Sequence, residues 1–144
     1  MNSTKTVLLV DDEPSLLNVL AEMLEGAGYA VIPVSDAEAA LTVLLNGAAV
    51  DLVITDLKLP GMGGYELAGV LRKALPSVPI IMLTAYGSVK SYVESRSMGI
   101  FEYINKPVQT KELRRIVKKA LAESGTGSAS SASHRAGAGV LSQL

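Results

Sequence analysis

Two short, mostly apolar runs of this sequence end in aspartate. Val7–Val10 is followed by Asp11 and Asp12, and Leu52–Thr55 is followed by Asp56. Runs of this kind bounded by polar residues are typical of strands buried on both faces. If the two strands are neighbours, about 4.8 Å apart, their terminal carboxylates converge and repel one another unless a cation lies between them. An all-oxygen donor set favours Mg²⁺, although a solvated acidic loop would explain either strand end taken singly.

A hydroxyl and an ammonium group follow two further strand-like runs. Thr84 comes directly after Pro79–Leu83, and Lys106 comes after Phe101–Ile104 with one residue between them. Beside a metal-carboxylate cluster, a lysine neutralises phosphoryl oxygens and a hydroxyl donates a hydrogen bond to them. Asp56 is then the candidate nucleophile, whose attack on phosphorus would give an acyl phosphate. A strand-end cap and a solvated turn lysine are the ordinary interpretations of each residue alone, but their joint position favours phosphoryl binding.

The composition excludes several other chemistries. The chain has 144 residues, no cysteine and a single histidine, His134, in a Gly/Ser-rich tail. Thiolate catalysis, disulfides, a Ser-His-Asp triad and a histidine metal site are therefore not expected. No apolar run approaches the roughly 20 residues of a membrane span, and the N-terminus lacks the layout of a signal peptide. We expect a cytoplasmic protein without membrane contact.

The formal net charge of -1 conceals an asymmetry. Residues 1–70 carry 10 acidic and 2 basic side chains, whereas residues 71–144 carry 4 acidic and 11 basic ones. The near-neutral total argues against direct nucleic-acid binding by this chain. The basic positions of the last expected helix suit either a docking or dimer surface or a merely solvated face, and the sequence leaves both open.

Strand-like and helix-like segments alternate along the chain. Strands are expected over Val7–Val10, Ala30–Val34, Leu52–Thr55, Pro79–Leu83 and Phe101–Ile104. Helices are expected from Pro14 to just before Gly26, from Asp36 as N-cap to about Asn46, over Tyr65–Ala74, over Ser88–Ser97 and from Thr110 to about Glu123. Such alternation predicts an α/β fold, a flavodoxin-like (βα)5 doubly wound parallel sheet of strand order 2-1-3-4-5. Its ligands would bind beyond the carboxyl ends of the first and third strands, where the aspartates lie.

The C-terminal segment differs in composition from the rest of the chain. Residues 124–144 are dominated by Gly, Ser and Ala, and such a stretch buries too little apolar surface to offset its ordering entropy. We expect one domain over residues 1–123 and a flexible tail or linker over residues 124–144.

Four sequence motifs, in this order and spacing, resemble the receiver domain of bacterial two-component response regulators. They are Val10-Asp11-Asp12-Glu13-Pro14, Asp56-Leu57-Lys58-Leu59-Pro60-Gly61-Met62, Leu83-Thr84-Ala85 and Tyr103-Ile104-Asn105-Lys106-Pro107. The resemblance covers about residues 5–122. The stretch from Leu83 to Val89 is most similar to receivers of sigma-54-dependent transcription activators.

The resemblance implies a phosphoacceptor signalling domain. A sensor histidine kinase or phosphotransfer protein would pass a phosphoryl group to Asp56, with Mg²⁺ as cofactor. The metal ligands would be Asp11, Asp12, Asp56 and the main-chain carbonyl of Lys58. Thr84 and Lys106 would hold the phosphoryl oxygens, and catalysis would be limited to the domain's own phosphotransfer and autodephosphorylation.

The resemblance also implies a conformational switch. Thr84 and the strand aromatic Tyr103 would be its moving parts, although a half-buried aromatic with no such role is the simpler interpretation of Tyr103. Lys58 and Tyr86 would tune the lifetime of the phosphate, and the Lys106–Pro107 bond would be cis, which X-Pro bonds permit. A homodimer would form through the fourth helix, fifth strand and fifth helix, or through the first helix.

Three rival functions fit the sequence less well. A haloacid-dehalogenase-like phosphatase needs a second acid two residues after the nucleophile, where this chain has Lys58. A flavin or nucleotide module would need phosphate-binding loops where this chain has acids. An inactive receiver used only as a scaffold would not need the intact set of Asp12, Asp56, Thr84 and Lys106.

Overall fold

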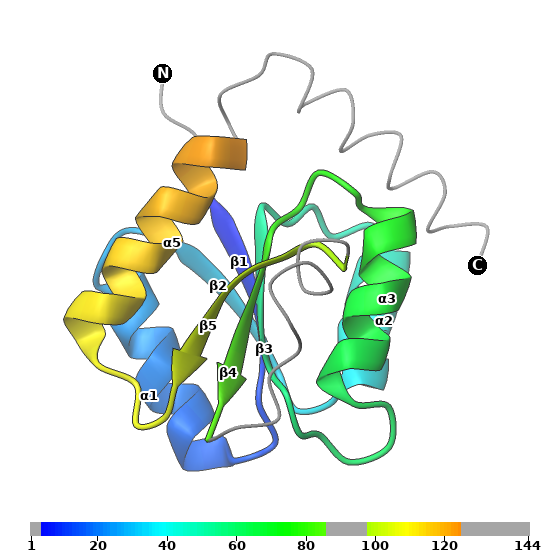
Figure 1. Ribbon diagram of the computed structural model, residues 1–144, viewed down its shortest axis with the longest axis horizontal. Helices are drawn as coiled ribbons and strands as arrows, with labels where there is room; N and C mark the ends of the chain where they lie inside the picture. The colour runs from blue at the N-terminus through cyan, green and yellow to red at the C-terminus, as the bar shows by residue number, and fades with distance from the viewer. Residues whose placement is uncertain (1–3, 86–97, 125–144) are drawn as a thin grey trace.

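The computed structural model describes residues 4–85 and 98–124, which form one parallel sheet with helices on both faces (Figure 1). The strands are β1 (Thr6–Val10), β2 (Ala30–Val34), β3 (Leu52–Asp56), β4 (Ile80–Thr84) and β5 (Ile100–Asn105). The helices are α1 (Pro14–Glu25), α2 (Ala37–Leu45), α3 (Gly64–Ala74) and α5 (Thr110–Ser124). The strand order is β2-β1-β3-β4-β5 with all pairs parallel, so the predicted doubly wound topology is confirmed.

Two apolar clusters hold the helices to the sheet. Residues of β1, β3 and β4 alternate between them, because successive side chains of a strand point to opposite faces. Leu8, Val53 and Met82 pack with α2 and α3, whereas Leu9, Ile54 and Ile81 pack with α1 and α5. Figure 1 shows the same division, with α1 and α5 on one side of the sheet and α2 and α3 on the other. The central strands are therefore apolar along their length, as the sequence predicts.

The element boundaries agree with the sequence to within about one residue. Pro14 occupies the first turn of α1, and the carboxylate of Asp36 caps α2 by accepting a hydrogen bond from the Ala39 N–H (2.7 Å). The helix expected over residues 88–97 and nearly all of the expected tail lie outside the described residues. Ser124, placed in that tail by the sequence, is instead the last residue of α5. Within the described part of the chain, no helix is long and apolar enough to cross a membrane.

The register of the sheet brings the aspartates of two strands to one edge. Val10 of β1 pairs with Thr55 of β3, so Asp11, the residue after β1, lies next to Asp56, the last residue of β3. The switch in strand order lies here, because β1 connects to β2 on one side of the sheet and β3 leads to β4 on the other. Ligands of open α/β sheets bind at such a switch point, beyond the carboxyl ends of the strands.

Gly64 allows the start of α3 to lie directly against the end of β3. A Cβ atom at this position would be 2.5 Å from the carbonyl oxygen of Asp56 and 2.9 Å from the Cα of Leu57. Both contacts are with backbone, which cannot rotate away. The Gly64 N–H donates to the Leu57 carbonyl at 2.9 Å. The loop after Asp56 is therefore closed onto its own strand, and only glycine fits there.

Replacing Gly64 with alanine should destabilise the domain. The added methyl group overlaps backbone, and overpacking of this kind costs about 1–3 kcal/mol. The free energy of unfolding, measured by urea titration, should fall by that amount. Gly69→Ala is the matched control, because it lies in the same helix with no atom within 4 Å of a Cβ. That variant should gain up to about 1 kcal/mol from helix propensity, and equal effects of the two substitutions would contradict the packing argument.

Candidate functional site

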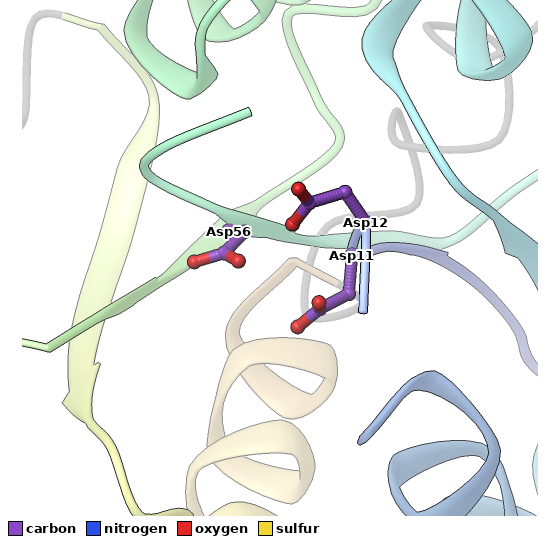
Figure 2. Close-up of side chains that lie close together, drawn as sticks. All are labelled: Asp11, Asp12 and Asp56. Carbon is purple, nitrogen blue, oxygen red and sulfur yellow. The ribbon is translucent and has the colours of Figure 1, made fainter. Parts of the chain in front are cut away.

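Three aspartate side chains converge at the carboxyl edge of β1 and β3 (Figure 2). Asp11 and Asp12 lie in the loop after β1, and Asp56 is the last residue of β3. One carboxylate oxygen from each residue lies within 4.8 Å of the corresponding oxygens of the other two. Asp11 is completely buried and Asp56 is 7% exposed, whereas Asp12 is open to solvent. The predicted acidic cluster is therefore formed, with one member facing the solvent.

Asp11 is held in place by the backbone around it. Its Oδ1 accepts a hydrogen bond from the Glu13 N–H at 2.9 Å, which fixes the turn into α1. Its own N–H donates to the carbonyl of Val34 at the end of β2 (3.1 Å). The remaining oxygen, Oδ2, points to the ammonium group of Lys106 at 3.5 Å. Asp11 thus stabilises the loop after β1 with one carboxylate oxygen and faces Lys106 in the site with the other.

Lys106 reaches the cluster from the loop after β5. Its Nζ lies 2.9 Å from Oδ2 of Asp56, and the lysine side chain is 22% exposed. Its backbone N–H donates to the carbonyl of Thr84 (2.8 Å), which ties the ends of β4 and β5 together. The Lys106–Pro107 peptide bond is cis, in agreement with the sequence-based expectation. One cation therefore faces two buried aspartates that lie 95 and 50 residues away in the sequence.

The charges of the site perturb one another. Burial raises the pKa of Asp56 above its ordinary value, the ion pair with Lys106 opposes that rise, and the charges of Asp11 and Asp12 add to it. Burial by itself would lower the pKa of Lys106, but its pairing with Asp56 and Asp11 outweighs burial and raises that pKa. An ionised Asp56 therefore carries a net free-energy cost in the folded domain without a metal ion.

A cavity of about 350 Å³ opens beside Asp56. It is lined by Asp56, Leu57, Lys58, Thr84, Ala85 and Lys106. Thr84 is 3% exposed and ends β4, while Lys58 is exposed two residues beyond Asp56. The structure thus brings the predicted acid, hydroxyl and ammonium groups to one cavity. Tyr86 lies outside the described residues.

The donor set fits a hard divalent cation. All three side-chain donors are carboxylates, and Mg²⁺ is held in proteins by one or two such groups together with water and phosphate oxygens. Burial is the main reason that the pKa of Asp56 is raised, and a divalent charge would relieve the repulsion from Asp11 and Asp12 that adds to this rise. Lys58, whose carbonyl is the expected fourth protein ligand, belongs to the same cavity wall.

Several contacts around the site have no signal in the sequence pattern. A carboxylate oxygen of Glu38, in the first turn of α2, lies 3.4 Å from the N–H of Met62 in the loop after β3. The Tyr65 and Tyr103 hydroxyls are 2.9 Å apart. Both contacts join segments more than twenty residues apart that periodicity does not relate. Only knowledge that α2 and α3 cover the same face of the sheet, and that the Tyr103 side chain of β5 packs on that face, could have suggested them.

The family model of the response regulator receiver domain matches residues 7–118. This chain belongs to the response regulator receiver family. The match covers β1 from its second residue, the other four strands and most of α5. It therefore includes every residue of the acidic cluster and of its cavity.

Similar proteins agree with this assignment. The receiver domain is 39% identical over 118 residues to the transcriptional regulatory protein GlrR of Escherichia coli, covering 82% of this chain but 26% of GlrR. The chain thus spans about a quarter of that relative. The structure of response regulator protein TrrA from Thermotoga maritima, in complex with Mg²⁺ and BeF, has a TM-score of 0.73 and 39% identity, covering 82% of this chain and all of TrrA. A CheY-like receiver from Methanospirillum hungatei has a TM-score of 0.78 and 35% identity, covering 85% and 97% of the two chains.

Neutralising Asp56 should stabilise the receiver domain at neutral pH in the absence of metal. The folded-state pKa of Asp56 lies above its unfolded value of 3.8. The folded domain therefore holds the Asp56 proton more tightly than the unfolded chain does. The stability that this gives is fully present below pH 3.8 and is lost as the pH rises through the folded-state pKa. Asp56→Asn carries no charge at any pH, so in EDTA its free energy of unfolding should exceed that of the unmutated domain at pH 7. Urea titrations at decreasing pH should show this difference closing toward pH 3.8.

Asp51→Asn provides the control for this measurement. Asp51 lies at the opposite end of β3, where its carboxylate accepts a hydrogen bond from the Thr6 N–H (2.8 Å). An asparagine there can still accept that bond, so no gain at neutral pH is expected. A lower stability of Asp56→Asn than of the unmutated domain at pH 7 in EDTA would contradict the net cost assigned to the ionised carboxylate.

Proposed function

We propose that this receiver domain accepts a phosphoryl group on Asp56 from a sensor histidine kinase or phosphotransfer protein. The observation that carries the proposal is the ion pair of 2.9 Å between Asp56 and Lys106, beside a cavity that Thr84 also lines. The carboxylate is thereby placed at a cavity wall with a fixed cation next to it. The cavity is large enough to admit a phosphoryl group.

The reaction can be written with this chain's own groups. A carboxylate oxygen of Asp56 attacks the phosphorus of a phosphohistidine, the new O–P bond forms as the P–N bond breaks, and the leaving imidazole takes up a proton. Lys106 and the Thr84 hydroxyl stabilise the charge on the transferred oxygens. Asp11, Asp12, Asp56 and the Lys58 carbonyl would hold Mg²⁺, which supplies further neutralisation of that charge. In autodephosphorylation, water would attack phosphorus as the O–P bond to Asp56 breaks, which releases inorganic phosphate and restores the Asp56 carboxylate; Lys58 and Tyr86 would tune its rate.

Phosphorylation would then change the surface away from Asp56. The acyl phosphate would carry roughly -1.5 to -2 charge where the carboxylate carried one negative charge, and its phosphoryl oxygens would draw the Thr84 hydroxyl toward them. Tyr103 lies on the same face of the sheet as Thr84 and would respond to the space released. We infer that the resulting change on β5 and α5 controls an output module or partner, as in a transcription regulator, with the sigma-54-dependent activators as the expected class.

Partner binding is proposed on two surfaces. The exposed side of α1 carries Val19, which is 45% exposed, between the half-buried Leu16 and Met23. This apolar stripe is a candidate docking site for the kinase or a second copy of the domain. The exposed cations of α5 are the candidate partner surface for dimerisation or output; they are Lys111, Arg114, Arg115, Lys118 and Lys119.

A small phosphodonor should modify the domain at Asp56. Incubation with acetyl phosphate and Mg²⁺ should add the mass of one phosphoryl group, and borohydride reduction followed by peptide mass spectrometry should place it on Asp56. Asp56→Asn should give no product. Thr84→Ala should slow the reaction roughly 10²-fold, the loss found when one oxyanion donor is removed. Asp51→Asn should react normally, and a product that survives Asp56→Asn would refute the proposal.

Mg²⁺ should stabilise the folded domain through the acidic cluster. At a free concentration about 100 times the dissociation constant, binding raises the free energy of unfolding by about 2.7 kcal/mol. Thermal or urea unfolding with Mg²⁺ or with EDTA measures this gain. Asp12→Asn should lose most of it, because it removes an exposed ligand without opening a buried cavity, while Asp51→Asn should keep it. Equal gains in Asp12→Asn and Asp51→Asn would place the ion elsewhere.

A further inference from the structure

A hydrogen bond joins two tyrosines from different elements beside the site. Tyr65 lies in the first turn of α3 and Tyr103 lies on β5, and their hydroxyl oxygens are 2.9 Å apart across 38 residues of sequence. Either hydroxyl can donate. Both side chains are half-buried and pack against the apolar cluster on the α2 and α3 face. The bond is therefore sheltered, and its geometry depends on the position of both rings.

This contact fixes the direction of the Tyr103 side chain. β5 is an edge strand, and β4 separates it from β3. Tyr103 pairs in register with Met82 of β4, and Met82 is a buried member of the same cluster. To reach α3, the Tyr103 ring must cross over β4 toward the middle of the sheet instead of pointing away from its edge. Figure 1 shows α3 on the sheet face opposite α1 and α5. The Tyr103 side chain packs against the apolar cluster on the α3 side.

Both ends of the tyrosine pair are connected to the phosphoacceptor end of the sheet. Tyr65 directly follows Gly64, which packs on the backbone of Asp56 and Leu57. On β4, Thr84 is two residues beyond Met82, so Thr84 and Tyr103 are diagonal neighbours on one face. Side chains so close in a packed layer share volume, and a movement of Thr84 toward Asp56 frees space for the ring.

We propose that Tyr65 is a positioning residue that holds the Tyr103 ring over β4 and thereby favours the arrangement in which Thr84 approaches a phosphoryl group on Asp56. The inference rests on the proposed function and adds to it the group that sets the switch equilibrium. The hydrogen bond exists only when Tyr103 points across the sheet, so it stabilises that orientation over any other. A ligand that requires this orientation of Tyr103 binds with an apparent affinity proportional to the fraction of molecules in that orientation.

Tyr65→Phe tests the proposal because it removes one oxygen and keeps the ring. In the unmutated domain, NMR should detect a nuclear Overhauser effect between the Tyr103 ring and the Met82 methyl group, and this effect should weaken in Tyr65→Phe. The apparent affinity for beryllofluoride with Mg²⁺ should fall by up to about fivefold, the factor for loss of a hydrogen bond worth ~1 kcal/mol. Tyr103→Phe should lower it equally, and the double variant should lower it no further.

Tyr29→Phe is the matched control, since Tyr29 packs against the cluster on the opposite face. It should change neither the Met82 signal nor the beryllofluoride affinity. The proposal is overturned if Tyr65→Phe leaves the Tyr103 signal unchanged, or if that signal weakens without loss of affinity. Failure of the unmutated domain to bind beryllofluoride at Asp56 would refute the proposed function instead, while the NMR signal would still decide whether Tyr65 positions Tyr103.

Discussion

The repulsion among three carboxylates at one edge of a parallel sheet is the constraint on which the rest of this structure depends. Asp11 and Asp56 are buried, Asp12 is exposed, and their oxygens lie within 4.8 Å of one another. Burial penalises the charges of the two buried aspartates, and proximity penalises all three charges together. Among the described residues, the ammonium group of Lys106 offsets part of this cost from 2.9 Å and 3.5 Å. The described residues of the site therefore carry more negative than positive charge, which favours a divalent cation, and such a cation would in turn offset the negative charge of a phosphoryl group.

The fold supplies the rigidity that such a site requires. Both faces of the central strands are buried under helices, so β1 and β3 cannot separate to relieve the repulsion. Gly64 allows the start of α3 to pack directly against the end of β3. The Lys106 N–H donates a hydrogen bond to the Thr84 carbonyl and so joins the ends of β4 and β5. These contacts are between backbone groups, so the ends of β3, β4 and β5 are fixed relative to one another.

The same face of the sheet connects the site with the molecular surface. Thr84 and Tyr103 are diagonal neighbours on β4 and β5, and the Tyr103 hydroxyl meets Tyr65 of α3. In the proposed switch, a change at Asp56 would reach both ends of this arrangement, through Thr84 on one side and through the Gly64 backbone on the other. Such coupling would need no long pathway, because the groups lie on adjoining strands and one helix N-terminus. A small preference between two ring orientations is enough to shift such an equilibrium.

The sequence by itself determined the strands, their order and the chemical composition of the site. Buried strands are encoded locally by apolar runs, and residues such as Asp11, Asp56 and Thr84 immediately follow or end them, so their place at one sheet edge follows from parallel topology. The tertiary structure alone decided which side chains touch. The ion pair of Lys106 with Asp56, the reach of Glu38 to the Met62 N–H and the bond between Tyr65 and Tyr103 each join segments far apart in the chain. Such contacts depend on the packing of whole helices against the sheet and on side-chain orientation, neither of which is encoded in local periodicity.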